Sequence, residues 1–128
     1  MTEGLEAVTA AALSLALDAA SLRQQAHALN IANASSEGYA PVRVSFEAQL
    51  ESARAELGTT GFVRPGSLED VAPALEPVGP GPAGMPAKVQ LDLEVAAMSH
   101  NAGHYHALLR AVSKHYSVLA SAVRDGKK

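Results

Sequence analysis

The chain contains no cysteine and no tryptophan, and its only aromatic residues are three tyrosines and two phenylalanines among 128 residues. Without cysteine, a disulfide bond and a zinc–thiolate site are both excluded. Much of the 48% hydrophobic content is alanine, which favours helix but buries little surface area. We therefore expect a helical protein whose own hydrophobic core is thin.

Positive charge is also scarce: ten basic residues stand against 13 acidic ones, for a formal net charge of −3. Nucleic-acid binding needs a basic patch, so nucleic acid is not an expected partner. No Lys or Arg precedes Arg23, and Glu3 and Glu6 precede the 11-residue apolar run Ala7–Leu17. A cleaved signal begins with positive charge, and such a run is too short to cross a bilayer. We expect neither a cleaved signal peptide nor direct membrane insertion.

Two long segments repeat apolar residues at alternating intervals of three and four. This heptad spacing predicts an N-terminal helix over residues 1–33 and a C-terminal helix over residues 89–128. The stripe of the first helix, here called the N-terminal stripe, comprises Leu5, Val8, Ala12, Leu15, Ala19, Leu22, Ala26 and Leu29. The C-terminal stripe comprises Leu91, Val95, Met98, Ala102, Tyr105, Leu109, Val112, Tyr116, Leu119 and Val123.

The segment between these helices has a different composition. Residues 34–57 predict a loop, a short extended piece from alternating Val42, Val44 and Phe46, and a short helix capped by Ser45. Six glycines and six of the seven prolines fall within residues 58–88, which predicts a flexible loop. The predicted fold is mainly α, in one structural unit. Its two long terminal helices form a coiled-coil-like pair or an inter-subunit bundle, with a short irregular middle.

Five histidines raise the question of a metal site. His100 and His104 have a workable ligand spacing, but the sequence has no HExxH motif and no third ligand that can be placed. We interpret them as part of a polar helix face, and Asp92 and Glu94 as acids that complement the helix dipole. We expect no catalytic, cofactor-binding or metal-binding residues, although a small metal-binding helical protein using His100 and His104 stays open as an alternative.

Residues 30–39, at the end of the first predicted helix, read NIANASSEGY. Asn33 can end the helix or bond to nearby backbone, Gly38 can adopt a positive φ, and Tyr39 can anchor the returning chain. The stretch resembles the N-terminal signature of bacterial flagellar axial proteins, the rod and hook family, whose usual form is close to NIANxxTPGY. The matching residues are Asn30, Ile31, Ala32, Asn33, Gly38 and Tyr39. Ser36 and Glu37 stand where Thr and Pro are usual.

The C-terminal stretch from Val89, VQLDLEVAAMSHNAGHYHALLRAVSKHYSVLASAVRDGKK, is similar to the C-terminal helix of the proximal rod members of this family. The resemblance covers roughly Leu5–Phe46 and Val89–Gly126 and leaves the middle uncovered. It implies a non-enzymatic structural subunit of the flagellar basal-body rod, the axial drive shaft needed for motility. Such a subunit uses no cofactor and assembles with itself through its terminal helices, by contacts that do not close on themselves.

The resemblance also implies partners and a location. The partners are other copies of the chain, other rod proteins, the adaptor proteins between the MS ring and the rod, and the flagellar type III export apparatus. The location is the rod that spans the periplasm, reached by export without a cleaved signal. The residues expected at the assembly interface are Leu15, Leu22, Leu29, Leu91, Met98, Tyr105, Leu109, Val112, Tyr116 and Leu119. A cytoplasmic helical adaptor or chaperone that binds a partner helix is the alternative left open.

Overall fold

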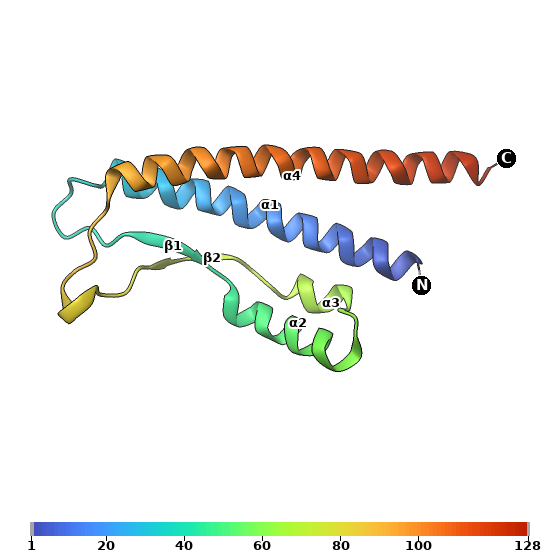
Figure 1. Cartoon of the computed structure of the whole chain (residues 1–128), viewed down its shortest axis with the longest axis horizontal. Coiled ribbons are helices and arrows are strands. Elements are labelled where there is room, and N and C mark those ends of the chain that lie inside the picture. The colour runs from blue at the N-terminus through green and yellow to red at the C-terminus, as the bar shows by residue number, and fades with distance from the viewer. Residues whose placement is uncertain (1, 128) are drawn as a thin grey trace.

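The computed structural model describes residues 2–127, apart from the side chains of residues 2, 3, 47 and 48. The protein is mainly helical, as predicted, with a long helix at each end and a short mixed segment between them (Figure 1). The elements in chain order are α1 (Thr2–Ala32), β1 (Val42–Ser45), α2 (Glu47–Thr60), α3 (Pro65–Glu69), β2 (Ala74–Pro77), the 3₁₀ helix η1 (Pro82–Gly84) and α4 (Leu91–Asp125).

Helices α1 and α4 form an antiparallel pair within one chain. They lie closest near the turn that follows α1 and diverge toward the two chain termini, which lie at the same end of the molecule (Figure 1). The middle elements pack on the other side of α1, so α1 is the central layer of the fold. The sequence predicted either a coiled-coil-like pair or an inter-subunit bundle of the terminal helices. The single chain contains the pair.

The hydrophobic core is as thin as the composition predicts. The fully buried apolar residues of the described chain are Ala19, Ala20, Ala26, Ala53 and Val71. Because hydrophobic stabilisation scales with the apolar area removed from water, alanine contributes less than larger side chains would. The contact between the long helices therefore depends on more than apolar burial.

Strands β1 and β2 form a two-stranded antiparallel sheet, with Val42 opposite Pro77 and Ser45 opposite Ala74. The extended piece predicted near Val42 is confirmed. The prediction of a loop throughout residues 58–88 is wrong, because this segment contains α3 and β2. Pro65 occupies the first turn of α3, where its missing N–H is not needed, and Pro77 ends β2 in a ribbon without a central strand.

The start of α2 also differs from the sequence prediction. The N-cap residue is Phe46 rather than Ser45, and it makes no side-chain capping hydrogen bond. The guanidinium group of Arg23 lies over the Phe46 ring, 5.4 Å from its centroid. This contact with α1 fixes Phe46 at the junction, so tertiary packing overrides the capping preference of serine.

Candidate assembly surfaces

The side chain of Asn30 closes the turn between α1 and β1. It is only 2% exposed, and its amide nitrogen donates to the carbonyl oxygen of Val42 at 2.9 Å. Its carbonyl oxygen accepts from the Val42 N–H at 2.9 Å and from the Tyr39 hydroxyl at 2.8 Å. One buried amide thus satisfies both backbone groups of the first strand residue and anchors the returning chain.

The rest of the signature shapes the same turn. The amide nitrogen of Asn33 donates to the carbonyl oxygen of Leu29 at 2.9 Å, and Gly38 has a φ of +75°. The local roles predicted for Asn33, Gly38 and Tyr39 are therefore confirmed, whereas the central role of Asn30 was not predicted. We call the structure formed by Asn30, Asn33, Gly38, Tyr39 and Val42 the corner.

Burial raises the pKa of the Tyr39 phenol, and the negative charge of Glu94 raises it further. Both effects favour the neutral hydroxyl, the form that donates to Asn30. Glu94 belongs to the first turns of α4. The corner is therefore electrostatically coupled to the beginning of the C-terminal helix.

Two polar contacts join α1 to α4, one heptad apart on both helices. Nδ1 of His27 lies 2.7 Å from Oε2 of Glu94. Asn101, 5% exposed, donates through its amide nitrogen to the carbonyl oxygen of Ala20 and to Oε1 of Gln24, both at 2.8 Å. A sliding of one helix along the other would break these bonds, so they fix the register of the pair.

Sequence reasoning did not find either contact. It explained Glu94 by the helix dipole and placed no role on His27, because a pairing over 67 positions leaves no local pattern. Asn101 offered a signal, since it is a lone amide beside an otherwise apolar stripe. A polar residue in such a position often specifies register in helix pairs.

The two sides of α1 contact different partners. Leu13 and Leu17 line a small cavity together with Val112 and Tyr116 of α4, on the α1 side that also holds Ala20 and Gln24. The opposite side of α1 faces the middle elements: Val8 lines a groove with Leu57 and Phe62, and Asn30 bonds to β1. Leu15 and Leu22 follow Val8 at heptad intervals. The N-terminal stripe therefore faces the middle elements of its own chain and not α4, and its residues Leu5, Ala12 and Leu29 are exposed.

The ten residues predicted for the assembly interface divide into two groups. Partly buried within this chain are Leu15, Leu22, Met98, Tyr105, Val112 and Leu119. The exposed residues, at 41–61%, are Leu29, Leu91, Leu109 and Tyr116. Heptad spacing identifies an apolar side of a helix but not which neighbour covers it. The free part of the predicted interface lies mainly on α4.

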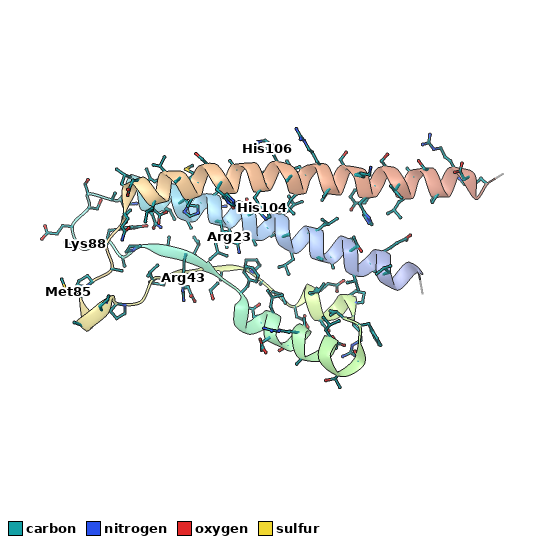
Figure 2. The ribbon with its side chains drawn as sticks, in the orientation of Figure 1. Arg23, Arg43, Met85, Lys88, His104 and His106 are labelled. Carbon is teal, nitrogen blue, oxygen red and sulfur yellow. The ribbon has the colours of Figure 1, made fainter. Side chains whose placement is uncertain are left out.

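Three of the histidines lie together. His100 and His104 line a shallow groove with His27 and Arg23. Figure 2 shows His104 where α4 meets α1, and His106 on the outer side of α4. Within residues 2–127, no group of three or more His, Cys, Asp or Glu side chains is arranged to hold a metal ion.

A partly buried carboxylate, that of Glu56, ties the middle elements together. Hydrogen bonds from Ser67 and from Arg64 hold the pKa of the Glu56 carboxyl below its ordinary value. These bonds join the end of α2 to α3. Their role is structural, since both Ser67 and Arg64 bind Glu56.

Helix α1 is the one described helix with the length and apolar composition needed to cross a membrane. In this structure it carries the buried amide of Asn30 and the polar side chains of Gln24 and His27, each bonded to another part of the chain. Both long sides of α1 contact protein.

Comparisons of the chain with protein-family models, with curated proteins and with solved structures found no match. The functional interpretation therefore depends on the corner, on the polar contacts between the helices and on the exposed apolar surface.

Proposed function

We propose that this protein is a structural subunit of a bacterial flagellar rod, similar to the proximal rod protein FlgB. In this proposal the chain assembles with itself and with other rod proteins through its long helices. It joins the rod through the MS-ring adaptor proteins, after passage through the type III export apparatus without a cleaved signal. It has no enzymatic role.

The observation that carries the proposal is the exposed apolar surface of α4. One side of α4 packs on α1, but apolar residues continue around the helix at positions that the described part of the chain leaves largely exposed. These residues are Leu91 (50% exposed), Val95 (49%), Leu109 (41%), Tyr116 (61%) and Val123 (60%). A row of exposed apolar residues along one helix is typical of a protein interaction site.

The corner supports the same proposal. The residues that resemble the axial-protein signature use their side chains to fix the turn after α1. A subunit in a rod that transmits torque needs its long helices held at a fixed angle and register. The contacts of Asn101 and of His27 with Glu94 join α1 to α4 and fix their register.

A cytoplasmic adaptor that binds a partner helix is the second candidate. The observation in its favour is that α1 and α4 already pair within one chain, which an isolated soluble adaptor needs. An adaptor uses the free stripe to bind one foreign helix, whereas a rod subunit uses it in a repeating assembly.

The test is to follow the chain and its variants into the basal body. A tagged copy is expected in hook–basal bodies purified from the source organism, and Leu109→Asp is expected to be absent from them and to abolish motility. Burial of an unpaired carboxylate in a helix interface costs several kcal/mol. Ala107→Asp, an exposed position two residues away on another side of α4, is the matched control and keeps motility.

Two results contradict the proposal. If Leu109→Asp is incorporated and supports motility as well as Ala107→Asp, the free stripe is not the contact surface. If the unaltered chain is absent from basal bodies and copurifies with one soluble helical protein, the adaptor function replaces the rod function. Circular dichroism of both variants establishes that neither substitution unfolds α4.

A further inference from the structure

A second apolar surface lies at the end of the molecule that carries both chain termini. The first turns of α1 and the turn between α2 and α3 enclose an open groove of about 820 Å³. Its walls include Leu5 and Val8 from α1 and Leu57, Phe62 and Val63 from the middle segment. Leu5 is 70% exposed and Phe62 is 60% exposed. A groove of this size and composition can hold one side of a helix.

The end of α4 offers an exposed apolar ridge. Leu109, Tyr116 and Val123 follow one another at seven-residue intervals and therefore lie along one side of the helix. Tyr116 and Val123 are 61% and 60% exposed, because α1 diverges from α4 toward the termini (Figure 1). We call these three residues the terminal ridge.

The segments that carry the two surfaces have opposite net charges, and Arg64, which lines the groove itself, is paired with Glu56. Residues 1–22 carry three acidic side chains and no basic one, and residues 47–70 carry five acidic and two basic ones. Residues 108–128, around the terminal ridge, carry five basic side chains and one acidic one. Opposite potentials favour the encounter of the two surfaces and disfavour pairing of either surface with itself.

The terminal ridge cannot fill the groove of its own chain. The groove lies between α1 and the α2–α3 segment, whereas α4 packs on the opposite side of α1 (Figure 1). The bonds from Asn101 to Ala20 and between His27 and Glu94 hold α4 there. The occupant that fits the groove in apolar character and charge is therefore α4 of a second copy.

We infer that the terminal ridge of one copy docks in the α1–α2–α3 groove of another copy. This inference deepens the proposed axial function, on which it rests for its biological setting. The contact joins two different surfaces, so each added copy presents a free ridge and a free groove to further copies. Repetition of this contact builds an open array.

The contact can be tested by cross-linking, because the chain has no cysteine of its own. Phe62→Cys and Val123→Cys are prepared separately, one with a mass tag, then mixed and treated with a short bismaleimide. A product joining one tagged and one untagged chain is expected. The matched control is Ser121→Cys, an exposed residue two positions from Val123 on another side of α4, which is expected to give at least about tenfold less product with Phe62→Cys.

A substitution in the ridge provides the second measurement. Val123→Asp is expected to weaken self-association of the otherwise unaltered chain at least about tenfold in sedimentation velocity, a change of ~1.4 kcal/mol. The matched control is Val118→Asp, since Val118 is as exposed, at 57%, but lies on a different side of the helix. Raising the salt concentration is expected to weaken the unaltered contact as well, because its charges are exposed.

The outcomes separate this contact from the proposed function. Assemblies of the unaltered chain in which Phe62→Cys and Val123→Cys do not cross-link overturn the contact and leave the axial function standing. A specific cross-link in particles that never exceed two copies supports the contact and overturns the axial function. Equal effects of Val123→Asp and Val118→Asp also overturn the contact, since a general charge effect then explains both.

Discussion

At the scale of single residues, the corner depends on the side chain of Asn30. Replacing it with alanine removes both bonds to the Val42 backbone and the bond from Tyr39. Each buried polar group left without a partner costs about 1–3 kcal/mol. Asn30→Ala is therefore expected to lower the free energy of unfolding by at least about 2 kcal/mol, measured by urea denaturation followed by circular dichroism.

Asn33 provides the matched control for this substitution. It lies one turn further along and makes one side-chain bond to backbone, to the carbonyl oxygen of Leu29, in a more exposed position. Asn33→Ala is expected to cost less than about 1 kcal/mol. Equal losses for the two variants would show that the turn is held by its backbone and that the buried amide is not its anchor.

The Tyr39 phenol gives a pH test of the corner. Burial and the charge of Glu94 raise its pKa above the ordinary tyrosine value. A raised pKa means that the neutral phenol stabilises the fold below the ordinary tyrosine pKa, and that this contribution is lost as the pH rises through the folded-state pKa.

The Tyr39 titration can be observed directly. In the double variant Tyr105→Phe and Tyr116→Phe, Tyr39 is the one tyrosine that remains of the three. The chain has no tryptophan that would absorb in the same range. Ultraviolet absorbance is expected to show a midpoint above that of the urea-unfolded chain. The shift is expected to shrink in Glu94→Gln, which removes the negative charge. Identical midpoints in the folded and unfolded chain would place Tyr39 in solvent and contradict the buried hydroxyl.

At the scale of secondary-structure elements, two glycines should respond in opposite directions. Gly103 lies inside α4, where an added Cβ meets nothing within 4 Å. Gly103→Ala is therefore expected to stabilise the protein by up to about 1 kcal/mol through helix propensity. Gly38 has equal room, but its φ is +75°, so Gly38→Ala is expected to destabilise by about 1 kcal/mol. Thermal unfolding of both variants measures the difference, and a change of the same sign in both would contradict the assigned backbone conformations.

The long helices could be predicted from the sequence because each depends on a local pattern. Heptad spacing over residues 1–33 and 89–128 gives the existence and approximate ends of α1 and α4. Strand β2 could not be predicted, because its partner residues in β1 lie about 30 positions earlier and its own residues, Ala74–Pro77, resemble the surrounding loop. A deletion from Pro77 to Pro82 would be harmless if these residues formed a loop. In this structure it would remove Pro77, which lies opposite Val42 in the sheet.

The candidate site could be predicted only in part, because only some of its contacts join residues that are close in sequence. The corner follows from a short signature whose bonds span nine to 12 positions, and the turn residues have strong backbone preferences. The contacts of Asn101 and Glu94 span 67–81 positions. Spacing alone also gave no way to decide that the N-terminal stripe packs on the middle of the chain. That choice is made by the middle segment, which returns along α1 on the side that carries the stripe.

At the scale of the whole molecule, the helix pair is held firmly at one end only. The corner and the contacts of Asn101 and His27 lie in the half near the turn. Toward the termini α1 and α4 diverge, and Leu5 and Val123 are 70% and 60% exposed. The local free energy of opening should therefore fall along the pair, from near the global value at the corner toward zero at the termini.

Amide hydrogen exchange on a dilute, verified monomer measures this gradient. We expect slow exchange in the paired segments 20–30 and 94–101, and fast exchange in the first two turns of α1 and in the last three turns of α4. Assembly is expected to slow exchange at the terminal end, because neighbouring copies then cover the ridge and the groove. Asn101→Ala is expected to extend fast exchange toward the corner, since it removes the bond that fixes the register. Uniform slow exchange along both helices of the monomer would mean that the pair is closed over its whole length. A pair closed in this way leaves no segment to be ordered by assembly, and it would favour the adaptor function over the rod.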